Sequence, residues 1–561
     1  MTTPKSPLLT DASTSLPGYV ADEIGEELEP GYGSIAQEQS SAETNDDEFL
    51  VPPRQMYVIL GCIFSLTFLA SLDTTILSTI MTEIASDLNA IPYLSWIATS
   101  YLLASSIVQP LGKLSDIFGR RPMILGCITI FTIGCLQCAT ATTAWSFVIG
   151  RFLSGFASGL NTLGSITMSD LVPLRKRGVY QGLANLCYGT GSAFGTLGGQ
   201  LAKKYGWRFV FWIQVPVGVS CFFLCLFNLK LPSVSTTTLT WKQKLKRVDV
   251  LGILSLAFTL FVFVVVTSFE WPSMSLLIAG CVVLFVSLGL FIYIENTAID
   301  PIVPPELLKN RSILGSSLAN WFGTMYLCCV TFYYPAYLTT VYGFDTGQVG
   351  NRLVPAIVVS SFASIGSGYY MKVTGKYRNF SIVVALLGLI SILVLVLTTR
   401  PKPVATLLPD VLLMIMPIVP YCSYVSMLTT TLLSLIASVP QEHQSAVTSV
   451  QYAFRSTGST LGTSLASLLF QWNLGHFLKT RLFQHAPENV SKEETLYIID
   501  KALHSATYIH SAPEWAVATL VNGYNVGCWS TFLYALVASL FGFLSILAVR
   551  EYKLHSTVSR K

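Results

Sequence analysis

Long apolar stretches recur along this chain from about residue 56 almost to its end. A helix needs about 20 consecutive apolar residues to cross the hydrocarbon core of a membrane. Fourteen stretches reach or nearly reach that length, which predicts an all-α membrane protein with 14 transmembrane helices. They are residues 56–80, 93–112, 122–141, 145–169, 178–202, 207–229, 248–269, 273–294, 311–340, 346–371, 380–398, 404–437, 442–472 and 525–548.

The composition and the charge distribution agree with this class. Only 11% of the 561 residues are charged, against about 25% in soluble domains. The first 50 residues hold eleven acids and one base, a net charge of −10. Because the whole chain has a net charge of +4, the remaining residues carry +14. We interpret this excess as loop charge beside membrane lipid, not as a surface for nucleic acid. All twelve cysteines fall in apolar stretches, which predicts neither a disulfide framework nor a zinc site.

Lysine and arginine cluster in alternate loops, at residues 113–121, 175–177, 242–247 and 372–378. Cytoplasmic loops carry such an excess of basic residues, so we assign these loops to the cytosol. An even number of crossings puts the tails 1–54 and 550–561 on the same side.

A charged turn bounded by glycines joins the second and third stretches. Gly112 and Gly119 allow two helices to approach closely and turn sharply. Asp116 can face a helix N-terminus, and Arg120 and Arg121 can anchor the cytosolic side. We predict that this segment is a cytosolic gate, latched by Asp116 and Arg120.

The segment from Gly368 to Arg378 repeats the seven-residue glycine spacing and the basic end of this turn, with Lys372 in place of the acid. Such a repeat predicts two six-helix halves, residues 55–230 and 311–549. The linker 231–310 between them would carry two inserted transmembrane helices. Chance glycine spacing is the alternative.

Two regions are predicted to lie outside the membrane. Residues 1–54 are acidic and rich in Ser, Thr, Pro and Glu, so we predict a disordered cytosolic tail. Within it, Tyr32 and Ile35 fit the tyrosine-x-x-bulky form of an endosomal sorting signal. Residues 473–524 are predicted to be a loop on the luminal side, with a glycosylation sequence at Asn489. Four histidines in this loop could sense an acidic lumen or be ordinary solvated residues.

Ionisable side chains within membrane spans are costly, and each is therefore a candidate functional residue. Counting along the first and fourth stretches places Asp73 and Arg151 at a similar depth, about 10 Å below the luminal surface. Burial favours the protonated form of such a carboxylate, and a nearby guanidinium favours its charged form. A cationic substrate that competed with the proton for Asp73 would produce antiport. The alternative is an ion pair that only fixes helix packing.

Three further candidates lie in the second half. Arg455 could hold a substrate carboxylate or line water with Gln451. Trp321 and Tyr326 belong to an aromatic-rich stretch that could contact a cationic side chain. Interface belts and core packing are the alternative for these rings.

Glycines in the fifth stretch form a small-residue seam that predicts close helix packing; they are Gly191, Gly195, Gly198 and Gly199. The sequence lacks a Walker-type phosphate loop, a zinc-protease helix and a nucleophile elbow. We therefore predict that the protein is not an enzyme and uses no cofactor or metal.

The Asp73 segment, the Gly112 turn, Arg151 and the glycine seam resemble the fourteen-spanner drug:proton antiporter branch of the major facilitator superfamily. Thr196 stands where that branch usually has proline. Further segments resemble the fungal vacuolar basic amino acid transporters: Trp96 to Leu103, Lys113 to Ile117, Ser169-Asp170, Arg177 to Gly182 and Ile213 to Pro216.

This resemblance extends from about residue 56 to residue 548. It implies the major facilitator fold, with two six-helix bundles and two inserted helices, in a monomer of the vacuolar membrane. It also implies that cytosolic Lys, Arg or His enters the vacuole in exchange for protons. The alternatives are the plasma membrane as location, and a multidrug:proton exporter or a non-transporting nutrient sensor as function.

Overall fold

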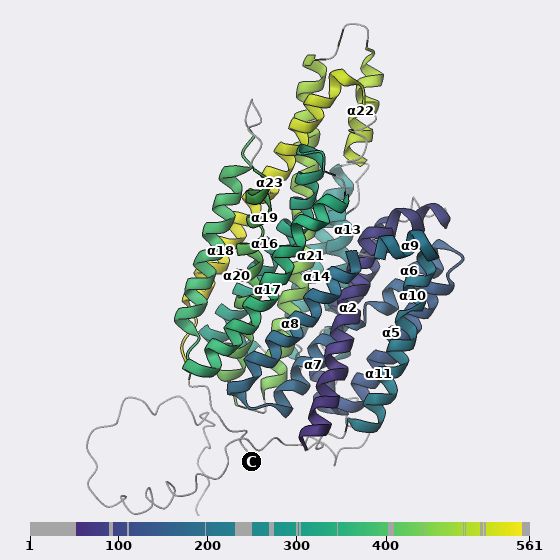
Figure 1. Ribbon diagram of the computed structural model, residues 1–561. Coiled ribbons are helices and arrows are strands. Elements are labelled where there is room, and N and C mark those ends of the chain that lie inside the picture. The colour runs from purple at the N-terminus through teal and green to yellow at the C-terminus, as the bar shows by residue number, and fades with distance from the viewer. Residues whose placement is uncertain are drawn as a thin grey trace, which may run out of the picture. The chain divides into compact units, whose positions relative to one another are not determined.

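The computed structural model describes residues 52–88, 94–108, 111–196, 198–229, 249–268, 274–298, 301, 305–344, 346–401, 409–440, 443–485, 487, 490–504, 509 and 512–552. Within these ranges the regular elements are all helices, and none of the described residues forms a strand (Figure 1). The all-α prediction is therefore confirmed for the part of the chain that the structure describes.

The first half contains ten helices or helix segments among its described residues. They are α2 (Pro53–Asp87), α3 (Leu94–Ile107), α4 (Leu111–Phe118), α5 (Arg120–Thr140), α6 (Ala144–Ser154), α7 (Ala157–Leu171), α8 (Leu174–Thr196), α9 (Gly198–Tyr205), α10 (Trp207–Trp212) and α11 (Gln214–Asn228). Their apolar side chains form separate buried clusters. One cluster includes Ile128 and Leu163, and another includes Phe147 and Phe211.

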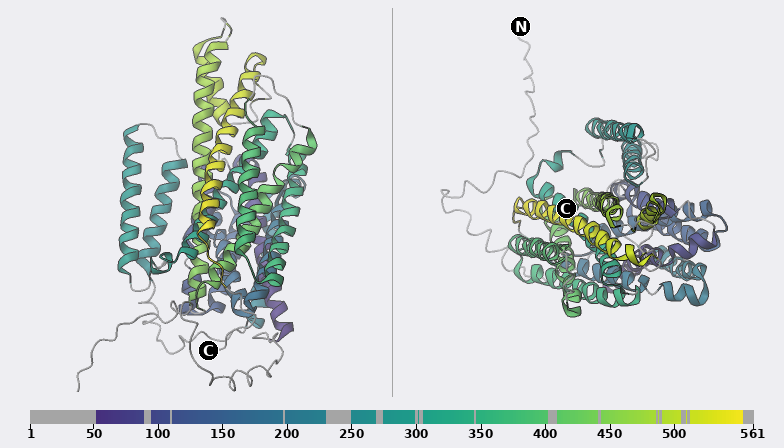
Figure 2. Two further views of the ribbon diagram at one scale, coloured as in Figure 1. Left: turned by 90° about the vertical axis from the view of Figure 1, so that its left-hand side faces the viewer. Right: turned by 90° about the horizontal axis from the view of Figure 1, so that it is seen from above.

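The remaining helices are α13 (Val250–Ser268), α14 (Met274–Thr297), α15 (Pro305–Leu308), α16 (Arg311–Val341), α17 (Thr346–Thr374), α18 (Arg378–Thr398), α19 (Asp410–Ile415), α20 (Ile418–Ala437), α21 (Gln444–His485), α22 (Lys492–His504) and α23 (Glu514–Leu547). Helices α16 to α21 and α23 pack around a core of their own, which includes Tyr334, Leu433 and Phe532. Helices α13 and α14 pair with each other beside the bundle, where α13 contacts both α3 and α21 (Figure 2).

Each predicted apolar stretch coincides with a helix or with two successive helix segments. Among the described residues, nine helices are long and apolar enough to cross a membrane. The other stretches form helices that are shorter, interrupted or more polar, so the count of fourteen crossings stays a prediction. One interruption, between α6 and α7, falls at Gly155, where a Cβ would lie 2.7 Å from the carbonyl oxygen of Tyr101 on α3. Only glycine allows α3 to pass this closely.

The two glycine-bounded turns have the same backbone feature. Gly119 precedes α5 with a φ of 96°, and Gly375 precedes α18 with a φ of 67°. Both values lie in the region that favours glycine. The second glycine of each copy is therefore required by the turn itself, and the internal repeat stays a prediction.

Residues 473–524 were expected to form a loop, and that expectation is wrong for most of them. Helix α21 continues to His485, α22 follows, and α23 begins at Glu514, so that α22 and the ends of α21 and α23 project beyond the bundle (Figure 1). We call these packed segments the projecting helices. Their shared core consists of Leu474, Leu478, Leu482, Ile498, Ile499, Ala502, Ala516, Leu520 and Tyr524. The four-residue spacing of the leucines continues the apolar stripe of α21, which the polar composition of the segment conceals.

Candidate functional site

Asp73 on α2 and Arg151 on α6 form a buried ion pair, as their predicted depths suggested. Arg151 Nη1 donates to both carboxylate oxygens of Asp73, at 2.9 Å to Oδ1 and 2.8 Å to Oδ2. The Asp73 side chain is 0% exposed and that of Arg151 is 1% exposed. A pair so removed from water must be held by its surroundings, because the attraction between the charges barely repays their desolvation.

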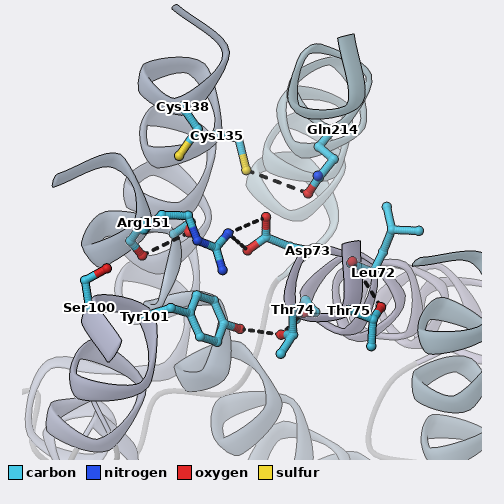
Figure 3. A network of polar contacts seen from close by, with 12 residues as sticks. Leu72, Asp73, Thr74, Thr75, Ser100, Tyr101, Cys135, Cys138, Arg151 and Gln214 are labelled. Carbon is cyan, nitrogen blue, oxygen red and sulfur yellow. Dashed lines mark hydrogen bonds and ion pairs between the residues drawn. The ribbon is translucent and has the colours of Figure 1, made fainter. Parts of the chain in front are cut away.

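Groups of the first half surround this pair (Figure 3). The ring of Tyr101 on α3 lies under the guanidinium, with 4.7 Å from its centroid to Arg151 Cζ. The Tyr101 hydroxyl is hydrogen-bonded to Thr74 Oγ1 at 3.0 Å. Beyond the pair, Cys135 of α5 donates to Gln214 Oε1 of α11 at 3.8 Å. Five helices of one half thus contribute to a single polar cluster.

The cluster has two consequences for chemistry. Both Asp73 oxygens are occupied and shielded, so a cationic substrate has no access to them in this conformation. Arg151 Nε, in contrast, is buried without a hydrogen-bond partner among the described residues. Direct competition between substrate and proton at Asp73 therefore requires a different conformation.

The predicted gate residues meet at the basic end of the bundle, by which we mean the end that carries Arg120 and Arg177. Arg120 pairs with Asp116, and its Nε donates to Asp170 Oδ2 at 3.0 Å. Arg120 Nη2 also donates to Ser445 Oγ of α21 at 3.1 Å, and Ser445 Oγ donates to Asp116 Oδ1 at 2.7 Å. These bonds join the first half to the second.

The other three residues of the gate segment have separate roles. Gly112 is crowded by Ser449, since an added Cβ would lie 1.8 Å from its Oγ. Gly119 makes the positive-φ turn described above. The exposed Arg121 donates from Nη2 to the carbonyl oxygen of Leu226, at 2.5 Å, and so contacts α11 instead of the second half.

Sequence reasoning missed several other contacts between the halves. Arg177 Nη1 donates to Gln444 Oε1 at 3.0 Å. Asn185 Nδ2 donates to Ser364 Oγ at 2.9 Å. A Cβ on Gly368 would lie 2.2 Å from the carbonyl oxygen of Gly178, so α17 and α8 touch through their backbones. No local pattern in the sequence identifies these partners, which are 179 to 267 residues away along the chain.

Arg455 lies apart from the Asp73 pair, on α21 where the two halves meet. Its Cζ is 5.8 Å from the ring centroid of Tyr188 on α8 and 5.9 Å from that of Tyr452 on α21. Tyr424 and Cys328 are within electrostatic range of its guanidinium. Across the same interface, the Tyr452 hydroxyl is hydrogen-bonded to Ser165 Oγ at 2.6 Å.

The two aromatic candidates occupy the second half. Trp321 is half-buried and packs edge-on against Phe454, with 6.3 Å between the ring centroids. Its Nε1 is buried without a hydrogen-bond partner among the described residues. Tyr326 is 3% exposed and packs edge-on against Tyr424 at 6.3 Å. Tyr326 therefore belongs to the core behind Tyr424, and Trp321 is next to the residue that precedes Arg455.

The glycine seam joins α8 to α2. A Cβ on Gly191 would lie 2.4 Å from the carbonyl oxygen of Phe68, and one on Gly195 would lie 1.8 Å from Thr75 Oγ1. Gly198 and Gly199 lie in α9, but their packing falls outside the part of the chain that the structure describes. The sorting residues Tyr32 and Ile35 and the glycosylation candidate Asn489 also lie outside the described residues.

Nothing in the described part of the chain resembles a metal centre. No group of three or more His, Cys, Asp or Glu side chains there could hold a metal ion. The twelve cysteines are free thiols. His476 is exposed on α21. The side chains of His485, His504 and His510 are outside the described residues.

Comparison with known proteins gives consistent matches. The sequence pattern of the family described as Major Facilitator Superfamily matches residues 63–463. The chain is 31% identical to the "Multidrug resistance protein fnx1" of Schizosaccharomyces pombe, over 90% of this chain and 94% of that protein. It is 30% identical to the "Vacuolar basic amino acid transporter 1" of Saccharomyces cerevisiae, over 76% of this chain and 80% of that protein.

The fold also matches a solved structure. The proton:xylose symporter XylE, described as a major facilitator superfamily protein, aligns with a TM-score of 0.56 at 14% identity. The alignment covers 89% of this chain and 98% of that chain. At this identity the match supports the fold and nothing finer.

Proposed function

The chain belongs to the major facilitator superfamily, and we propose that it is a proton-coupled antiporter that moves basic amino acids from the cytosol into the vacuole. The predicted resemblance and fold class are thus confirmed at the level of the family. The protein is a multi-pass membrane transporter of a small-molecule substrate and not an enzyme. The substrate, the coupling ion and the membrane are the proposal.

One observation carries the coupling mechanism: the ion pair of Asp73 and Arg151 is buried inside a membrane-spanning half. Intramembrane ionisable groups mark ion and proton pathways. We assign Asp73 as the proton carrier and Arg151 as the group that holds its charged form. Protonation from an acidic lumen would release Arg151, and deprotonation towards the cytosol would restore the pair.

The gate contacts indicate which state of the alternating-access transport cycle the described conformation represents. If the basic end faces the cytosol, as the distribution of Lys and Arg suggests, the bonds of Arg120 and Arg177 across the halves close the cytosolic side. Alternating access would then proceed by rocking of the two halves, within a monomer. The name of the Saccharomyces cerevisiae relative supports the vacuolar membrane and basic amino acids.

The decisive test is the Asp73→Asn variant in vacuolar vesicles with an acidified lumen. We expect proton-driven arginine uptake to fall to background, because the amide keeps the shape of the carboxylate but cannot exchange a proton. Asp87→Asn makes the same chemical change at the last residue of α2, 14 residues beyond Asp73, and should keep uptake near that of the unmodified protein. Undiminished uptake by Asp73→Asn, at equal protein amounts, would remove Asp73 from the mechanism.

A multidrug:proton exporter is the second candidate, because the Schizosaccharomyces pombe relative is described as a multidrug resistance protein. An exporter of this kind should prefer lipophilic cations and need no group that binds a carboxylate. Competition for transport by a lipophilic cation, with none by lysine, would favour it. Membership of a transporter family leaves the non-transporting sensor without support.

A further inference from the structure

Arg455 lies at a place where a transported molecule would contact both halves. It is 11 residues beyond Gln444, where α21 begins at the basic end. At about 1.5 Å per residue, this places it near the middle of a hydrocarbon core about 30 Å thick. The ring centroids of Tyr188 in the first half and Tyr452 in the second half lie 5.8 Å and 5.9 Å from its Cζ.

The positive charge of Arg455 has no counter-ion in the described part of the chain. None of the ion pairs found there includes Arg455. The acid predicted to serve transport, Asp73, is already bound by Arg151. A cation in the middle of a membrane protein is costly unless something pairs with it. Because the Arg455 side chain is only half-buried, its accessible part suits an anionic group of the transported molecule.

Tyr188 adds a second donor from the opposite half. Whereas the hydroxyls of Tyr452 and Tyr424 are bound to Ser165 and Thr324, the Tyr188 side chain faces Arg455 without a hydrogen bond to a described residue. An oxyanion bound by the guanidinium and reaching the Tyr188 hydroxyl at the ring edge would take charge-assisted bonds from Arg455 and one bond from the phenol. Guanidinium–carboxylate pairs are among the strongest and most directional of such contacts.

We propose that Arg455, assisted by Tyr188, binds the carboxylate of the substrate, at a site separate from the proton site at Asp73. This inference rests on the proposed function and narrows it. The transporter would select amino acids and reject the corresponding amines, which carry the same side chain but no carboxylate. Substrate and proton would then be coupled through the structure and not by competition for one acid.

A short contact route joins the two sites. Ser71, two residues before Asp73 on α2, donates from Oγ to the carbonyl oxygen of Tyr188 at 2.6 Å. The same hydroxyl is hydrogen-bonded to Ser192 Oγ at 2.8 Å. Movement of α2 upon protonation of Asp73 would therefore be transmitted to the helix that carries Tyr188.

The test compares labelled arginine uptake in the presence of unlabelled arginine or of agmatine, its decarboxylated form. In the unmodified protein, arginine should compete at least about tenfold better than agmatine, as expected for the loss of a charge-assisted hydrogen bond. Arg455→Gln should lower arginine uptake by a similar factor and abolish the preference for arginine over agmatine. Arg455→Lys, which keeps the charge, should retain part of both. Arg481→Gln, an exposed arginine on the same helix, is the matched control and should behave as the unmodified protein.

The outcomes separate this inference from the proposed function. If the unmodified protein shows no proton-driven uptake of arginine, lysine or histidine, the proposed function fails and the inference falls with it. If uptake is present but agmatine competes as well as arginine, the carboxylate site is wrong and the antiporter assignment stands. This comparison uses only the unmodified protein, so it decides the question even if Arg455→Gln does not fold. A preference for arginine that persists in Arg455→Gln would also overturn the inference.

Discussion

Arg151 uses a single terminal nitrogen for both oxygens of Asp73 and leaves its Nε without a partner among the described residues. The guanidinium is thus held mainly by the carboxylate in front of it and the Tyr101 ring beneath it. Removing one member of a buried ion pair typically costs about 3–5 kcal/mol. At the scale of residues, the proposed proton site should therefore be sensitive to groups that never bind the proton.

Tyr101→Leu should weaken coupling without removing the charged pair. A desolvated cation–π contact contributes about 2 kcal/mol, so we expect proton-driven uptake to fall by roughly tenfold or more. Arginine exchange in the absence of a proton gradient should change much less, because Arg455 is untouched. Tyr57→Leu, which replaces an exposed tyrosine on α2, is the control. Equal losses of uptake and exchange would show that Tyr101 only supports the fold.

Asp87, the last residue of α2, offers a prediction about pH. Hydrogen bonds from Arg208, at 2.7 Å, and from the Trp207 indole, at 3.2 Å, lower the pKa of Asp87 below its usual value. A carboxyl with a lowered folded-state pKa stabilises the protein above its unfolded-state pKa of about 4, and this effect is lost as the pH falls through the lower folded-state value. The Tm difference between the unmodified protein and Asp87→Asn should therefore be constant from neutral to mildly acidic pH.

Measurements of Tm in detergent at about pH 7, 5 and 3.5 would check this. The difference should be small, since both side chains of the pair are partly exposed, and it should shrink only below about pH 4. A difference that disappears already at about pH 5 would contradict the assigned direction of the pKa shift.

At the scale of elements, glycine contacts decide how closely the helices pack. Gly191 of α8 rests on the backbone of α2, whereas Gly61 of α2 has nothing within 4 Å of the position that a Cβ would occupy. The two glycines therefore differ in surroundings, although both lie within helices. This contrast provides a direct test of the seam.

Gly191→Ala should destabilise the first half, because its Cβ would lie 2.4 Å from the Phe68 carbonyl oxygen. Overpacking of this kind costs about 1–3 kcal/mol, which should appear as a clear decrease of the Tm in detergent. Gly61→Ala should be neutral or slightly stabilising, since alanine favours helix. Equal Tm values for the two variants would contradict the close approach of α8 and α2.

The projecting helices are a second element whose structure can be tested. Leu478 is 0% exposed in their core, whereas Leu496 on α22 is 49% exposed. Leu478→Ala should cost about 2–5 kcal/mol locally and make the chain between α21 and α23 more sensitive to protease. Leu496→Ala should leave protease sensitivity unchanged. If both variants resist protease equally, these segments do not pack as described.

At the scale of the whole molecule, α8 of the first half and α17 of the second half are in close contact at the basic end. Gly178 and Gly368 meet through their backbones, and Arg120 and Ser445 are bonded across the two halves at the same end. Gly366, two residues from Gly368 on the same helix, has nothing within 4 Å of the position that a Cβ would occupy. A substitution at position 368 should therefore change the distance between the two halves and leave helix α17 itself intact.

Gly368→Ala should separate the halves at the basic end, because its Cβ would lie 2.2 Å from the Gly178 carbonyl oxygen. A cysteine introduced by Ser445→Cys, where the native side chain is 6% exposed, should then react several-fold faster with a thiol reagent applied from the cytosolic side. The background should lack the twelve native cysteines. Gly366→Ala is the matched control, and equal labelling rates in the two variants would argue against this contact as the closure.

The sequence alone was sufficient for the membrane class, the helical stretches, the two glycine turns and the similar depth of Asp73 and Arg151. These features depend on hydropathy, helical rise and backbone conformation, which are local properties of the chain. Only the tertiary structure decided that Asp73 is sealed within one half, that Arg455 lies between the halves, and that residues 473–524 are largely helical. Which face of a helix meets which neighbour depends on packing between residues far apart in the chain, as for Arg120 and Ser445, and no local pattern records that partner.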